Sequence, residues 1–350
     1  MCKKAMPEFN SFIVNSIKRI TLDAVVLTLK IKPELKQFYR FSPGQYVTLE
    51  LQIDGVNVRR SYSICSEPDF ESFDVGIKKV QNGIFSTYVN EKLKISDSIN
   101  VGKPEGRFIW EPNENDKIMA IAAGSGITPI MSIIKSVIKH TKKSSLSLIY
   151  CNKSPEKTMF YEELQLLARH FPNRLNIHWT FTETNEKGAN FGRIDENYIN
   201  FVLNKNKVKS NKYFLCGPEK MIDLSKNCLI KKGISENQIL FELFKESSNK
   251  KEIIEAINTG FLNIKYDDVF YKLPLSAEKT ILDIALQAKI NVPYSCQGGV
   301  CCSCIAKIIE GEAKMKSNQV LTDDEIKEGL ILTCQAVSIS EKITIDYDDV

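Results

Sequence analysis

The chain has 350 residues, of which 43% are hydrophobic and 26% are charged, so its composition is that of a folded globular protein and excludes a disordered or fibrous one. Its length predicts two or three domains. The net charge of +4 is small and forms no basic stripe, so we expect no nucleic-acid partner.

The N-terminal residues give no sign of secretion or membrane insertion. Residues 1–12 lack the apolar core of a signal peptide. The longest uncharged run, 118–134, contains Gly124, Gly126 and Pro129 and is shorter than the roughly 20 apolar residues that span a bilayer. We therefore expect a cytoplasmic protein. Disulfides seldom persist there, so its ten cysteines indicate metal or redox chemistry.

Residues 8–112 predict an antiparallel β-barrel. Short β-rich segments such as "AVVLTLKI" and "QYVTLEL" alternate with Pro-Gly, Asp-Gly and Asn-Gly turns, and a helix is expected only near 86–91. In "RRSYSI", Arg60 and Tyr62 share one face of a strand, which places a positive charge beside an aromatic plane. In "NGIFSTYV", Gly83 and Ser86 begin the helix, where free amides suit a pyrophosphate. A serine cap without a ligand is the alternative.

Residues 113–245 alternate strand and helix, which predicts a parallel sheet with crossover helices. The stretch "AAGSGITPI" places Gly124, Gly126 and Thr128 between a strand and a helix, where glycines let the backbone approach a pyrophosphate. The next strand ends in "YCNKSPEK". Lys153 there suits the 2′-phosphate of NADPH better than the ribose hydroxyls of NADH, although it can equally be a solvated lysine.

A linker is expected at 246–260, followed by a third domain at 261–350. That last segment carries a net charge of −5 and the preceding residues +9, which fits either weakly attracting modules or an acidic module for a basic partner. Cys296, Cys301 and Cys304 have the spacing C-x4-C-x2-C, and Cys334 follows 30 positions later. This is the spacing of plant-type [2Fe-2S] sites. Zinc is the less favoured alternative, because only one C-x2-C pair is present.

Together these motifs resemble those of a known family. R-x-Y-S at 60–63, G-x-x-S at 83–86 and G-x-G-x-x-P at 124–129 are similar to the ferredoxin-NADP reductase family, and 261–350 resembles plant-type ferredoxins. The order of the motifs resembles oxygenase reductases of the phenylacetyl-CoA epoxidase type. The resemblance implies a flavin-binding barrel, an α/β nicotinamide domain and an α+β ferredoxin domain of β-grasp topology.

The resemblance also implies a role for particular residues. FAD would be bound by Arg60, Tyr62, Ser63, Ile77, Lys78, Gly83, Phe85, Ser86 and Phe244. The nicotinamide nucleotide would be bound by Gly124, Gly126, Thr128, Lys153, Cys216 and Gly217. Ser63, Cys216 and Glu242 would lie at the point of hydride transfer, and Cys296, Cys301, Cys304 and Cys334 would bind the cluster.

The expected activity is electron transfer from NAD(P)H, through FAD and the [2Fe-2S] cluster, to a protein partner that is an oxygenase component. A general reductase that serves a desaturase, a hydroxylase or a separate ferredoxin has the same motifs. A non-enzymatic zinc module would require every motif to be accidental. One departure from the ferredoxin pattern is Cys302, which is either a small tolerated side chain or an oxidation-sensitive thiol.

Overall fold

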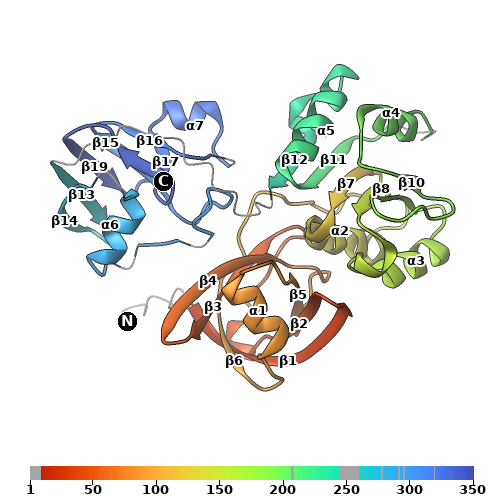
Figure 1. The fold of residues 1–350 in the computed structure, drawn as a ribbon, viewed down its shortest axis with the longest axis horizontal. Coiled ribbons are helices and arrows are strands. Elements are labelled where there is room, and N and C mark those ends of the chain that lie inside the picture. Colours follow the sequence, from red (N-terminus) through yellow and green to blue (C-terminus); the bar gives the residue numbers. More distant parts are fainter. Residues whose placement is uncertain are drawn as a thin grey trace. The chain divides into compact units, whose positions relative to one another are not determined.

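The structure is a computed structural model, and it describes residues 9–205, 209–243, 260–276, 279–290, 292–294, 296–318 and 320–350. The chain folds as two compact units, Met1–Phe244 and Lys245–Val350, which we describe separately (Figure 1). Residues 246–259 of the linker expected at 246–260 lie outside the described residues, as does Phe244. Over the described ranges no helix is long and apolar enough to cross a membrane.

The first half of unit 1 is the antiparallel barrel expected from its short strands (Figure 1). The strands are β1 (Phe9–Thr21), β2 (Ala24–Lys30), β3 (Tyr46–Ile53), β4 (Val56–Ser63), β5 (Ser72–Lys78) and β6 (Ser98–Gly102). Their order is β4-β3-β6-β1-β2-β5, and a bridge between Ile64 and Val75 joins the two ends of the sheet. Phe12, Tyr39 and Phe73 fill the interior with edge-on and stacked rings. A short helix, η1 (Pro33–Leu35), and α1 (Ile84–Glu91) complete this half.

The second half of unit 1 is a parallel sheet with helices, as the strand–helix alternation predicts (Figure 1). Its strands are β7 (Lys117–Ala123), β8 (Ser145–Asn152), β9 (Leu175–Phe181), β10 (Asn190–Phe191), β11 (Lys212–Gly217) and β12 (Ile239–Leu243). Its helices are η2 (Gly124–Gly126), α2 (Ile127–His140), η3 (Pro155–Lys157), α3 (Tyr161–His170), α4 (Glu196–Lys205), α5 (Glu219–Lys231) and η4 (Glu236–Gln238). The strand order is β10-β9-β8-β7-β11-β12, and all of these strands are parallel. The chain adds β8 to β10 on one side of β7 and then β11 and β12 on the other side, and ligands bind in such sheets where the order switches sides.

Direct contacts join the barrel to the parallel sheet within unit 1. The Ser132 hydroxyl of α2 donates to the Ser66 carbonyl at 2.6 Å, and Trp110 Nε1 donates to Asp116 Oδ2 at 2.8 Å. At Gly76 in β5, a Cβ atom would lie 2.7 Å from the methyl group of Thr128, so glycine there permits close packing of the two halves. This packing holds the end of β4 against the carboxyl edge of the parallel sheet.

Unit 2 is an α+β domain. Its elements are β13 (Phe261–Tyr266), β14 (Val269–Pro274), α6 (Ile281–Gln287), β15 (Ile305–Glu310), β16 (Ala313–Met315), α7 (Asp323–Lys327), β17 (Leu330–Leu332), β18 (Ala336–Ser338) and β19 (Lys342–Asp346). The main sheet has the order β14-β13-β19-β15-β17, in which β13 and β19 pair in parallel, while β16 and β18 form a second small sheet. Asp267 and Asp268 both have positive φ, as the tight turn between β13 and β14 requires.

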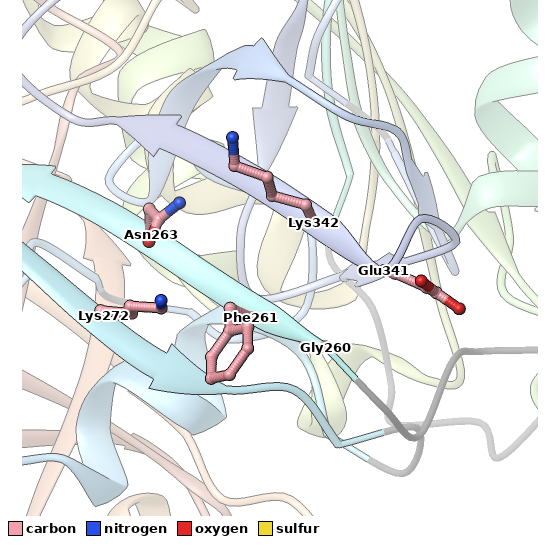
Figure 2. A pocket seen from close by; sticks show the side chains of 6 residues that line it. All are labelled: Gly260, Phe261, Asn263, Lys272, Glu341 and Lys342. Atoms are coloured by element: carbon pink, nitrogen blue, oxygen red, sulfur yellow. The ribbon is translucent and has the colours of Figure 1, made fainter.

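A cavity of about 300 Å³ lies at one end of the main sheet of unit 2 (Figure 2). It is lined by Gly260, Phe261, Asn263, Lys272, Glu341 and Lys342. The Lys272 ammonium lies 4.2 Å from the centroid of the Phe261 ring, a cation–π contact. None of the site residues expected from the sequence lines this cavity.

Candidate functional site

Three of the expected residues meet where the barrel adjoins the parallel sheet. Ser63, the last residue of β4, is buried, and its hydroxyl donates to Glu242 Oε2 at 3.4 Å. Glu242 lies in β12 and is paired in register with Cys216 of β11. Cys216 is fully buried. A hydroxyl, a carboxyl and a thiol from three strands therefore converge at the sheet edge where a hydride donor would be expected to bind.

Burial controls the protonation of this group. Burial raises the pKa of Glu242 from 4.5 to about 8, and the hydrogen bond from Ser63 opposes that rise. Burial, reinforced by the neighbouring Glu242, raises the pKa of the Cys216 thiol well above its usual value. At neutral pH both side chains are consequently protonated and uncharged. The site is then free of fixed negative charge at the position where a hydride would arrive.

The aromatic and basic residues of the R-x-Y-S motif lie in β4, beside α1. Tyr62 packs on Phe85 of α1 with ring centroids 5.6 Å apart, and burial raises the pKa of its hydroxyl. Arg60 is exposed, and its Nη1 donates to the Arg59 carbonyl at 2.6 Å. An aromatic plane and an exposed cation thus lie on one strand, an arrangement that suits a flavin ring and its phosphate.

The N-terminus of α1 has the features of an anion site. Gly83 is its cap residue, so no side chain there caps the first-turn amides. The Ser86 hydroxyl accepts from the Val80 amide at 3.2 Å and donates to the Gly83 carbonyl at 3.4 Å, which fixes the turn that leads into the helix. Uncapped amides and the positive end of a helix dipole fit a pyrophosphate.

Two residues of the neighbouring strand β5 occupy different environments. The Ile77 side chain is fully buried in the barrel core, and its carbonyl accepts from Asn90 Nδ2 at 3.2 Å. Lys78 is half-buried, with its ammonium 3.7 Å from Asp23 Oδ2. Any contact of Ile77 with a cofactor is therefore through its backbone.

The two glycines of the G-x-G-x-x-P motif have different physical roles. Gly124 has φ +55°, and a Cβ there would meet no atom within 4 Å, so space is open beside the turn. At Gly126 a Cβ would lie 2.2 Å from the Cys216 carbonyl oxygen, so glycine is needed for close packing against β11. Thr128 is buried and donates to the Ser125 carbonyl at 3.0 Å. No side chain caps the α2 N-terminus that follows, which leaves amides for a second pyrophosphate.

The structure places Lys153 in a charged cluster that the sequence did not predict. Its ammonium lies 3.3 Å from Glu183 Oε1, and the Lys157 ammonium lies 2.8 Å from Glu183 Oε2. Glu183 follows β9, 30 positions beyond Lys153. The sequence does show an acidic residue, Glu183, just after the strand β9. Only the order of strands in the sheet shows that this residue lies beside Lys153 and Lys157.

The four cysteines of the ferredoxin-type spacing interact with one another in unit 2. Hydrogen bonds from Cys301 and Cys334 hold the pKa of the Cys296 thiol well below its usual value, and a hydrogen bond from Cys334 lowers the pKa of Cys304. The same contacts raise the pKa values of Cys301 and Cys334. The Gly298 amide also donates to Cys296 Sγ at 3.3 Å. Backbone amides and thiols thus surround a single small region.

These four thiols are the candidate ligands of a metal centre in unit 2. In the part of the chain that the structure describes, no three ligand-type side chains converge on one point at metal-binding geometry. A [2Fe-2S] cluster would be held by four cysteine thiolates, two on each iron. A zinc site would need all four around one ion. Cys302 is half-exposed, unlike buried Cys301 and Cys304.

Comparisons with known proteins agree with this division of the chain. The model of the oxidoreductase FAD-binding domain matches residues 11–110, and that of the oxidoreductase NAD-binding domain matches 120–227. The model of the 2Fe-2S iron-sulfur cluster binding domain matches 267–338. The chain is thus an oxidoreductase with FAD-binding, NAD-binding and [2Fe-2S] domains.

Full-length relatives define the family. The chain is 32% identical to a component of the 1,2-phenylacetyl-CoA epoxidase of Escherichia coli (strain K12), over 98% of this chain and 99% of that one. It is 28% identical to the ferredoxin reductase component of 3-ketosteroid-9-alpha-monooxygenase of Rhodococcus rhodochrous, over 95% of both. The crystal structure of phthalate dioxygenase reductase has the same fold, with a TM-score of 0.64 and 23% identity, and covers 97% of this chain and 98% of that one.

The chain accordingly belongs to the ferredoxin-NADP reductase superfamily, in the branch with a C-terminal plant-type [2Fe-2S] domain that includes this epoxidase component. The expectations for the fold class, the cofactor set and the oxidoreductase class are confirmed. The roles of individual residues stay predictions.

Proposed function

We propose that the protein is the reductase component of an oxygenase system and passes electrons from NAD(P)H to an oxygenase partner of the phenylacetyl-CoA epoxidase type. The observation that carries the partner class is the full-length match to two proteins that are named as oxygenase components. None of the described cysteines forms a disulfide, which suits a cytoplasmic protein, the location we propose.

When bound, FAD accepts a hydride as an electron pair and a [2Fe-2S] cluster carries electrons singly, which is the chemistry that such a reductase requires. The chain supplies position and electrostatics. Ser63 donates a hydrogen bond at the end of β4, the neutral Glu242 holds the Ser63 hydroxyl in place, and the buried Cys216 borders the nicotinamide subsite. These three residues place no fixed negative charge at the point of transfer.

The remaining residues bind the cofactors. Tyr62 would lie against the flavin ring, Arg60 would pair with a phosphate, and the amides at Gly83 and Ser86 would bind the diphosphate. Gly124 leaves room for the nucleotide pyrophosphate. Cys296, Cys301, Cys304 and Cys334 would bind the [2Fe-2S] cluster.

An anaerobic titration of the purified protein with NADH and with NADPH tests this proposal. We expect flavin absorption to bleach first and iron-sulfur absorption to bleach as more reductant is added. A purified oxygenase component should then reoxidise both chromophores, and faster than a separate ferredoxin does. Zinc in place of iron, or a chain isolated without flavin, would overturn the proposal. Equal rates with unrelated acceptors would favour a general reductase instead.

A further inference from the structure

The carboxyl ends of β8 and β9 carry a charged cluster of Lys153, Lys157 and Glu183. One carboxylate bridges two ammonium groups, at 3.3 Å to Lys153 and 2.8 Å to Lys157. The backbone holds this arrangement in register, because the Glu183 amide donates to the Lys153 carbonyl at 2.9 Å and the Thr182 amide donates to the Asn152 carbonyl at 3.0 Å. Glu183 is therefore a fixed feature of this edge of the sheet.

Strand register places the cluster beside the glycine turn. Ala123, Cys151 and Thr180 are paired across β7, β8 and β9. Gly124 begins the turn directly after Ala123, whereas Lys153 and Glu183 lie just beyond the ends of the next two strands. A nucleotide whose pyrophosphate lies at the glycine turn extends its adenosine ribose over the end of the second strand. That ribose would lie against this cluster.

The lysines do not provide a net positive charge here. Hydrogen bonds from Lys157 and Lys153 lower the pKa of Glu183, so its carboxylate is ionised at neutral pH. Glu156 lies between the two lysines in sequence and accepts a hydrogen bond from the Ser154 hydroxyl at 2.7 Å. Two carboxylates thus balance two ammonium groups, and the Ser154 hydroxyl, which would suit a phosphate, already has a partner.

A carboxylate distinguishes the two nicotinamide nucleotides by simple chemistry. It accepts hydrogen bonds from the 2′- and 3′-hydroxyls of the NADH ribose, and it repels the 2′-phosphate of NADPH. We propose that Glu183, positioned by Lys153 and Lys157, selects NADH over NADPH. This inference rests on the proposed nucleotide site at Gly124, and it is the opposite of the preference expected from Lys153 alone.

Binding of adenosine fragments to the holoprotein tests Glu183 directly. 5′-AMP carries the ribose hydroxyls, and 2′,5′-ADP carries the additional 2′-phosphate. We expect the wild-type protein to bind 2′,5′-ADP no more tightly than 5′-AMP. Glu183→Gln should tighten 2′,5′-ADP binding by about tenfold and weaken 5′-AMP binding slightly, because like-charge repulsion is removed while two lysines are released. The ratio of kcat/KM for NADPH to that for NADH should rise in parallel.

Glu186→Gln is the matched control, because it removes an exposed carboxylate from the same loop. It should leave both affinities unchanged. Replacing both lysines in the Glu183→Gln protein (Lys153→Met, Lys157→Met) should abolish the gain for 2′,5′-ADP. Folding is not expected to fail, since Glu183 is exposed and surface ion pairs contribute little to stability. Flavin that stays bound to each purified variant would show that the variant is folded.

The outcomes separate the inference from the proposed function. If Glu183→Gln binds both fragments with the wild-type ratio, or if the wild-type protein prefers 2′,5′-ADP by tenfold or more, the role of Glu183 is wrong while the nucleotide site stands. If neither fragment binds the wild-type protein and NADH does not reduce it, the proposed function itself is overturned.

Discussion

Ser63 and Glu242 lie 179 positions apart in the chain, and their side chains meet at 3.4 Å. Glu242 is partly buried in β12, between exposed Phe241 and buried Leu243, and an acidic residue in a strand would ordinarily face solvent. Ser63 of the barrel contacts Glu242 instead, and burial raises the pKa of Glu242 to about 8. Its protonation is therefore sensitive to pH near the physiological range.

Stability should depend on pH through Glu242. In the unfolded chain the Glu242 carboxyl has a pKa of 4.5, whereas in the folded chain its pKa is about 8. The free energy of unfolding is therefore highest below pH 4.5 and decreases as the pH rises toward 8, because only the unfolded carboxyl ionises readily in that range. Glu242→Gln is neutral throughout. The temperature at which half of the flavin is released should be the same for the wild-type protein and Glu242→Gln at pH 5. At pH 9 it should be about 3 °C higher for the variant, a value that includes a reduction of the electrostatic effect by solvent screening. Glu34→Gln, an exposed control, should show no such trend. A pH-independent difference would contradict this account of Glu242.

The cysteine assignment makes a second prediction at this scale. Cys304 is buried and shares a hydrogen bond with Cys334, whereas the nearby Cys302 is half-exposed. Cys304→Ser should lower the iron content at least about tenfold, because one iron loses a thiolate ligand. Cys302→Ser should retain the wild-type iron content and iron-sulfur absorption. Iron analysis and visible spectra decide the matter, and iron loss in Cys302→Ser alone would refute the ligand set.

Among the single elements, the turn between β7 and α2 combines two functions. Gly124 opens space at the end of β7, and Gly126 allows α2 to pack against the end of β11. Both residues look alike in the G-x-G-x-x-P motif. Their different surroundings follow from the reversal of strand order, which places β11 beside β7.

The two glycines should therefore respond differently to alanine. Gly126→Ala should destabilise unit 1 by about 3 kcal/mol, since the Cβ would lie 2.2 Å from a backbone oxygen that cannot move freely. Gly124→Ala should cost only about 1 kcal/mol, the conformational cost of a positive φ. Denaturant unfolding followed by circular dichroism measures both. Equal losses would show that packing against Cys216 is not the constraint at Gly126.

Across the whole molecule, the chain contains two units with separate hydrophobic cores. The FAD-binding and NAD-binding matches fall within Met1–Phe244, and the [2Fe-2S] match falls within Lys245–Val350. Reduction of the flavin and onward transfer of electrons therefore depend on different units. They should be separable by cutting the chain.

A chain that ends at Phe244 should retain flavin and oxidise NADH with ferricyanide as acceptor at a rate within about twofold of the full chain, because its core is complete. It should contain no iron and should not reduce an oxygenase component. The complementary fragment 245–350 should contain all of the iron. Loss of flavin from the shorter chain would show that unit 2 is needed to form the flavin site.

Local patterns predicted a barrel, a parallel α/β sheet and an iron-sulfur site, because hydrophobic periodicity, turn glycines and cysteine spacing are all read over short stretches, whereas FAD and the β-grasp topology followed from the family resemblance. They did not reveal α4 and α5, although Ile222, Ser225 and Leu229 of α5 have helical spacing after Pro218.

The side-chain contacts at the site could be learned only from the folded chain. Those of Ser63 with Glu242, of Gly126 with Cys216 and of Lys153 with Glu183 depend on strand order and register. The charge of Glu242 and of Glu183 depends on the residues that bury each carboxyl or pair with it, and those residues lie far from it along the chain.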